Sequence, residues 1–335
     1  MSSSPLLSLR MKSTRSTPPM ERCQFDVELA DRVKVMLSQE LSYAYRCNDY
    51  LFRRKMEKVE EISSCGTEDG SVPPMIQEID TLCREKMCEW AYRVVDHFHA
   101  PREIVAIAFS CLDRFVDRCC CDRAAFKLAA MTCIYIATKV FNAREIAMSS
   151  LAELSRGEFD MAHIAEMEGI ILTTLNWRMH PPTIQCFINH FYTLLPLARG
   201  PITRAIYRRA SFFGELSLFD YSFVTLPRSA VAIAALINAM EGMEGTVKIE
   251  DQVAFFDTIT QTTGIDHTKD TIDSIRNRLW YIYSQSAQYQ DDEVNPTQQK
   301  VYKESKVPEQ IRSHRDAGDQ SPVCVSVVTT RRRLI

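Results

Sequence analysis

The chain has 335 residues, of which 46% are hydrophobic and 25% are charged, a composition ordinary for a globular protein with a buried core. Its formal net charge of −3 argues against a protein whose main task is to hold nucleic acid, because such proteins carry a basic surplus. No apolar run has the length of a membrane span and no signal-peptide core is present at the N-terminus, so we expect no membrane partner.

The N-terminal part predicts a tail followed by helix. Residues 1–26 are rich in Ser, Pro and Arg with little apolar content, which indicates disorder. From residue 27 apolar side chains such as Val33 and Leu37 recur at helical spacing, and Gly and Pro then mark a linker at 63–74. The sequence therefore predicts an N-terminal helical segment and linker over 27–74.

Residues 75–182 predict a domain of five helices. The first, at 75–99, carries one apolar stripe, and the second begins at Pro101. The third, at 122–141, is small or apolar on all sides over residues 128–138, so we expect the others to surround it. A short helix at 149–154 follows, and Asp160 is the expected N-cap of the fifth, which stops before Pro181.

The same plan repeats over residues 183–286. Helices are predicted at 183–195, 201–219, 227–241, 249–262 and 267–286, and the third is again small and apolar all round. We interpret the chain as an all-α protein with a duplicated five-helix domain. Residues 287–335 are polar and predict a second disordered tail.

No enzyme machinery is evident. The sequence lacks the phosphate-binding loops, the HExxH zinc motif and the GxSxG nucleophile motif. The twelve cysteines are scattered without a CxxC pair, which favours reduced, buried thiols over a metal site. We expect no catalytic residue, no metal and no cofactor.

Four charged residues lie in segments that otherwise predict buried helix: Arg84, Asp113, Lys139 and Glu168. A buried charge costs several kcal/mol unless it is paired or serves a partner. Arg84 and Asp113 fit a salt bridge between the first two helices, and a purely stabilising role is the favoured interpretation. For Lys139 and Glu168 the pattern alone favours a lysine and a glutamate that reach solvent.

These residues belong to segments that resemble the cyclin family. The matching segments are Arg84 to Trp90, Leu112-Asp113-Arg114-Phe115, Leu128 with Ala137-Thr138-Lys139, and Met167-Glu168 to Trp177 followed by Pro181-Pro182-Thr183. The first half is similar to an N-terminal cyclin box. The second half is similar to a C-terminal box chiefly in pattern, helped by Leu226-Pro227. The phrases Leu37-Ser-Gln-Glu40 and Asn48-Asp49-Tyr50-Leu51 are similar to G1-type cyclins.

The resemblance implies two tandem five-helix cyclin boxes and roles for individual residues. Arg84 and Asp113 would form the buried pair, supported by Leu128. Lys139 and Glu168 would hold the backbone of a cyclin-dependent kinase, with the apolar side chains of Phe141, Trp177 and Met179 packed on the kinase helix.

The resemblance also implies a function and partners. The chain would be the activating regulatory subunit of a cyclin-dependent kinase in cell-cycle control. It would form a heterodimer with the kinase, contact kinase substrates and inhibitors, and act in the nucleus and cytoplasm. No nucleic acid partner is expected.

The chain departs from the family pattern in two places. Val140-Phe141-Asn142-Ala143 stands where cyclins often have an aromatic and two acidic residues, so one acidic kinase contact is missing. The substrate-docking patch of cell-cycle cyclins falls on Cys83, Lys86, Met87 and Trp90, where Lys86 adds a charge.

Three alternatives stay open from the sequence. The fold could serve a transcription-associated cyclin or a B-type general transcription factor, although the acidic balance counts against the latter. It could serve a helical adaptor without a kinase, in which Lys139 and Glu168 are surface charges. An unrecognised enzyme is the third.

Overall fold

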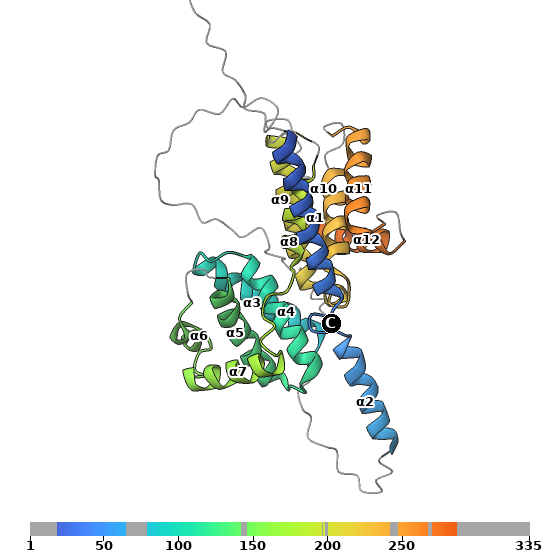
Figure 1. Ribbon diagram of the computed structural model, residues 1–335. Coiled ribbons are helices and arrows are strands. Elements are labelled where there is room, and N and C mark those ends of the chain that lie inside the picture. The colour runs from blue at the N-terminus through green and yellow to red at the C-terminus, as the bar shows by residue number, and fades with distance from the viewer. Residues whose placement is uncertain are drawn as a thin grey trace, which may run out of the picture.

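The structure, a computed structural model, describes residues 19–64, 79–141, 146–195, 197, 200–241, 247–266 and 270–286. These residues form twelve α-helices and one short 3₁₀ helix, and no strand occurs among them (Figure 1). The predicted all-α class is therefore confirmed. The tails at 1–18 and 287–335 and most of the predicted linker, at 65–78, lie outside the described residues.

The first domain surrounds its third helix. Its elements are α3 (Thr81–His97), α4 (Glu103–Arg118), α5 (Arg123–Val140), α6 (Met148–Leu154) and α7 (Met161–Thr174). α5 packs against all four other helices, and the small and apolar residues along most of its length are buried. Asp80, Asp122 and Asp160 cap α3, α5 and α7, each accepting a hydrogen bond from a backbone N–H three residues on.

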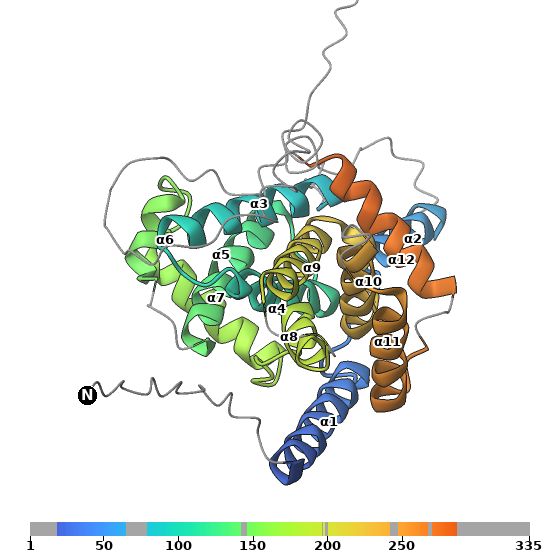
Figure 2. The ribbon, with the colours of Figure 1, turned by 90° about the horizontal axis from the view of Figure 1, so that it is seen from above.

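The second domain repeats this arrangement around α10. Its elements are α8 (Ile184–Thr193), α9 (Pro201–Phe219), η1 (Tyr221–Phe223), α10 (Arg228–Glu241), α11 (Ile249–Thr263) and α12 (Asp270–Ser284). Every residue of α10 from Ser229 to Met240 is buried. Gly264, at φ +73°, ends α11 in the left-handed conformation that glycine adopts without steric cost. Figure 2 shows the two sets of helices side by side, each with its own hydrophobic core.

The two N-terminal helices have different locations. α1 (Pro19–Leu41) packs on α8 and α11 of the second domain, where Val33 joins the core. It begins within the predicted disordered tail, so residues 19–26 are helical here and not disordered as expected. α2 (Tyr50–Ser64) extends away from the body beyond the end of α4 (Figure 1) and includes residues 63 and 64 of the predicted linker.

The two domains meet through α3, α4 and α9. Tyr92 of α3 stacks on Phe219 of α9 with ring centroids 5.4 Å apart. Arg102, just before α4, donates a 3.0 Å hydrogen bond to Glu215 of α9. This contact fixes the second domain against the helices that carry the buried arginine–aspartate pair.

Candidate functional site

Arg84 and Asp113 form a buried bidentate salt bridge between α3 and α4. Arg84 Nε and Nη2 donate to the two carboxylate oxygens of Asp113, each at 2.8 Å. Its remaining nitrogen, Nη1, donates at 2.7 Å to the backbone carbonyl of Leu218 in α9. One guanidinium thus joins two helices of the first domain to the second domain.

The surroundings of this pair keep Arg84 charged. Burial alone would lower the pKa of Arg84, but the charge and hydrogen bonds of Asp113 raise that pKa above its usual value. Tyr50 of α2 donates a further 3.0 Å hydrogen bond to Asp113 Oδ1. Leu128 is buried in the same hydrophobic core, where the family resemblance placed it as support.

Lys139 and Glu168 lie at a different surface, on α5 and α7. Lys139 Nζ forms an ion pair with Glu168 Oε1 and lies 4.2 Å from the centre of the Tyr135 ring. The lysine side chain is 38% exposed and the glutamate side chain 17% exposed. The structure thus pairs the two residues with each other, at a place that solvent or a partner can reach.

The three apolar residues expected beside this ion pair divide into two groups. Trp177 is 72% exposed and Phe141 is 36% exposed, so both offer apolar surface to a partner. Met179 is only 6% exposed and belongs to the core of the first domain. Its expected role as a contact residue does not fit this burial, and we correct it to a core residue.

A turn after α7 produces this difference. Asn176 and Trp177 have φ values of +49° and +58°, and the Trp177 N–H donates at 2.9 Å to the carbonyl of Leu172. This hydrogen bond closes a turn of six residues and is the Schellman motif that often ends a helix, with Asn176 in the left-handed conformation. The turn directs the chain so that Trp177 faces outward while Met179 returns to the core.

α7 also exposes more apolar surface than a typical amphipathic helix. Only Ile164 and Ile171 of its fourteen residues are buried, whereas Met161 and Ile170 are exposed. Gly169 lies on the open side, and a Cβ added there would meet no heavy atom within 4 Å. We call the surface made by Lys139, Phe141, Glu168, Gly169, Ile170 and Trp177 the α5–α7 face.

The expected docking patch on α3 is mostly covered. Cys83, Met87 and Trp90 are partly buried and pack against the core of the first domain, while Lys86 is exposed. The charged lysine is therefore the most accessible of the four patch positions, which leaves little apolar surface for a docking peptide.

Sequence reasoning did not single out Arg114, although its side chain is fully buried. Its Nη1 donates to the carbonyls of Ala44, at 3.1 Å, and Arg178, at 2.9 Å, and its Nε donates to the Ser110 carbonyl at 2.9 Å. Arg114 thus connects the segment between α1 and α2 to the turn that carries Trp177. The available signal was a charged residue directly beside Asp113, between the apolar residues Leu112 and Phe115 of α4.

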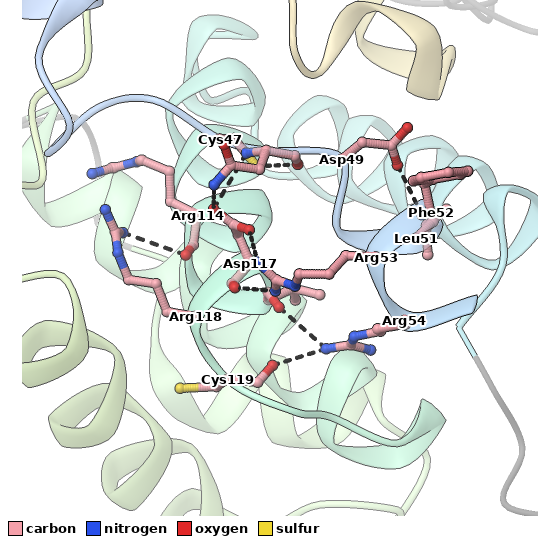
Figure 3. A network of polar contacts seen from close by, with 12 residues as sticks. Cys47, Asp49, Leu51, Phe52, Arg53, Arg54, Arg114, Asp117, Arg118 and Cys119 are labelled. Carbon is pink, nitrogen blue, oxygen red and sulfur yellow. Dashed lines mark hydrogen bonds and ion pairs between the residues drawn. The ribbon is translucent and has the colours of Figure 1, made fainter. Parts of the chain in front are cut away.

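A second set of contacts attaches α2 to the end of α4, and Figure 3 shows it. Arg53 donates a 2.8 Å hydrogen bond to Asp117 Oδ1, and Arg54 donates at 2.8 Å to the carbonyl of Cys119. Asp117 also accepts a hydrogen bond from the side chain of Asn48, at 2.9 Å. The arginines of α2 thereby satisfy carbonyl groups that the end of α4 leaves open.

The described residues contain no cluster of three or more His, Cys, Asp or Glu side chains that could hold a metal ion. Among the same residues, no helix combines the length and the apolar composition that a membrane span requires.

Comparison with protein families identifies both domains. Residues 54–180 match the model described as "Cyclin, N-terminal domain", and residues 182–314 match "Cyclin, C-terminal domain". The chain belongs to the cyclin family. The first match ends and the second begins just before α8.

Curated relatives are also cyclins. G1/S-specific cyclin-D1 of Mus musculus is 25% identical over 190 residues, which are 57% of this chain and 63% of that protein. Cyclin-B2-2 of Arabidopsis thaliana is 26% identical over 196 residues, 58% of this chain and 43% of that protein. The matched part thus spans less than two thirds of each relative.

A solved structure shows the same fold. The crystal structure of a viral cyclin from herpesvirus saimiri superposes with a TM-score of 0.53 at 15% identity, covering 69% of this chain and 97% of that one. This likeness concerns the cyclin fold alone.

Proposed function

We propose that this cyclin is the activating regulatory subunit of a cyclin-dependent serine/threonine kinase and controls progression of the cell cycle. The observation that carries the proposal is the α5–α7 face, where the Lys139–Glu168 ion pair lies in an apolar surface that no described element of the chain covers. Exposed apolar surface around polar groups is typical of a protein-binding site.

The proposed mechanism is a shift in the kinase population. A protein kinase is active only when a mobile helix brings a glutamate to its catalytic lysine. A partner that binds the active position of that helix more tightly than the inactive one moves the population toward the active state. A shift from about 1:99 to 99:1 requires about 5.5 kcal/mol of differential binding.

The α5–α7 face has the two features that this mechanism needs. Its helices are packed on one core, so the surface is preformed and loses little conformational entropy on binding. The ammonium of Lys139 and the carboxylate of Glu168 can exchange their mutual contact for charge-assisted hydrogen bonds to a kinase backbone carbonyl and N–H. Trp177 and Phe141 add apolar contact area beside them.

The experiment is recovery of kinase activity with the tagged full chain from its own cells. The wild type should capture a cyclin-dependent kinase, and the Lys139→Ala/Glu168→Ala variant should lose it while it stays folded, because an exposed ion pair contributes about 1 kcal/mol or less to stability.

The chain offers a matched control for this variant. Lys127 of α5 forms a 2.9 Å ion pair with Glu158, just before α7, with the two side chains 40% and 43% exposed. Lys127→Ala/Glu158→Ala removes one charge of each sign from the same two regions and should keep the kinase. Equal kinase recovery by the Lys139/Glu168 variant would refute the proposed interface, and recovery of no kinase by the wild type would favour an adaptor function.

The proposed location is the nucleus and cytoplasm. Fluorescence microscopy of the tagged protein tests it, and exclusion from the nucleus through the cell cycle would contradict it.

A further inference from the structure

A polar cavity lies where the connection between α1 and α2 meets the loop before α10. Its volume is about 390 Å³, and its walls include Glu40, Arg46, Asp49, Leu226 and Arg228. None of its lining residues belongs to the α5–α7 face.

The two carboxylates in this cavity already have partners. Glu40 accepts hydrogen bonds from the backbone N–H of Ser229, at 2.9 Å, and from its hydroxyl, at 2.6 Å. Asp49 accepts from the backbone N–H of Phe52, at 2.9 Å, and from the hydroxyl of Tyr221, at 3.0 Å. Both acidic groups are therefore engaged within the protein.

The two guanidinium groups are far less engaged. Within the described part of the chain, the guanidinium of Arg228 makes one hydrogen bond, from Nη2 to the Ser110 hydroxyl at 3.1 Å, and the guanidinium of Arg46 makes none. An arginine has five N–H donors, so most of the donors of both residues stay unused. Burial lowers the pKa of Arg228, as expected for a cation that lacks a directly bound carboxylate.

This imbalance predicts the charge of the ligand. Unused N–H donors of two cationic groups at the wall of a cavity favour an anion over a cation. A phosphate monoester carries nearly two negative charges and three acceptor oxygens, which matches two arginines better than a single carboxylate does. The cavity is also larger than one phosphate group, and Leu226 and Pro227 add apolar wall beside the arginines.

We propose that this cavity binds a phosphorylated serine or threonine in a segment of a partner protein, with Arg46 and Arg228 holding the phosphate. The inference rests on the proposed function in one respect: the bound segment would be a product of the associated kinase. A substrate phosphorylated once would then be retained at a distance from the α5–α7 face for further phosphorylation.

Fluorescence polarisation with the full chain tests this proposal without any kinase. The probe is a fluorescent peptide library, degenerate around a central phosphoserine or phosphothreonine, compared with the same library carrying serine, threonine or glutamate. The phosphorylated library should bind selectively, and Arg46→Gln and Arg228→Gln should each weaken binding about tenfold, the value of one lost charge-assisted hydrogen bond.

Arg204→Gln is the matched control, because Arg204 is an exposed arginine on α9 outside the cavity. It should leave binding unchanged. Equal binding of the unphosphorylated library, or binding unaffected by both cavity variants, would overturn the proposal. Competition by inorganic phosphate as strong as that by the peptides would overturn the assignment to a protein segment.

Thermal melting separates loss of the site from loss of the fold. Arg228→Gln removes a cation without a carboxylate partner, so the melting temperature should stay the same or rise while binding falls. Arg46 is exposed, so Arg46→Gln tests the phosphate site even if the other variant unfolds. Selective phosphopeptide binding by a chain that captures no kinase would support the cavity and refute the proposed kinase function.

Discussion

Arg84→Ala is the substitution that most directly tests how the two cyclin domains are held together. It removes both hydrogen bonds to Asp113 and the one to the Leu218 carbonyl. Asp113 would keep only the hydroxyl of Tyr50 as a donor in this network, and its carboxylate would stay in a buried place without a countercharge.

The size of the effect follows from this stranded charge. Removing one partner of a buried ion pair costs about 3–5 kcal/mol, because the other charge stays buried and unpaired. In a chain of this size, 1 kcal/mol lowers the melting temperature by about 2–4 °C, so we expect a fall of about 10 °C. Differential scanning calorimetry measures it, and the loss of the Leu218 contact should weaken the coupling between the two domains.

Arg93→Ala is the matched control on the same helix. Arg93 forms a 3.0 Å ion pair with Glu89 one turn earlier, but both side chains are exposed. Such a pair contributes about 0.5 kcal/mol, so this variant should melt within about 2 °C of the wild type. If Arg84→Ala and Arg93→Ala had the same melting temperature, the buried pair would not stabilise the fold as we argue.

Three further predictions concern other parts of the fold. Trp177→Ala should change the free energy of unfolding by no more than about 0.5 kcal/mol and should weaken kinase capture. Met179→Ala should lower the free energy of unfolding, measured by chemical denaturation, by about 2–5 kcal/mol. Similar denaturation curves for the two variants would contradict the turn described here. Arg114→Met should cost about 2–4 kcal/mol in the same assay, because it strands two backbone carbonyls, and an unchanged midpoint would show that those contacts are dispensable. Brief iodoacetamide treatment at pH 7 should modify the exposed Cys120 before the buried Cys88, since burial raises the pKa of the Cys88 thiol. Peptide mapping measures the order of modification, and modification of Cys88 first would contradict this prediction.

The helices were predictable because their signals are local. The runs of small and apolar residues at 128–138 and 229–240 predicted central helices, and α5 and α10 have that role. Asp160 was predicted as an N-cap from its place before an apolar stripe, and it accepts the expected hydrogen bond from His163 N–H at 2.9 Å.

The side chains that tertiary contacts control were not predictable in the same way. Trp177 and Met179 are both apolar and two residues apart, and only the left-handed turn at Asn176 decides which one is exposed. The stretch before residue 27 is rich in Ser, Pro and Arg as a whole, so its composition did not reveal that α1 starts at Pro19. Arg114 is buried because carbonyls from distant segments meet at its guanidinium.

The most direct test of the central claim is activation of the captured kinase by purified Gly169→Arg protein. The new side chain would project into open space from the α5–α7 face, so the fold should be intact and the arginine should clash only with a bound partner. Ala254→Arg, at an exposed alanine of α11 in the second domain, is the control. We predict full activation by the wild type and the control, and at most residual activation by Gly169→Arg with an unchanged melting temperature. Full activation by Gly169→Arg would contradict a kinase interface on this face.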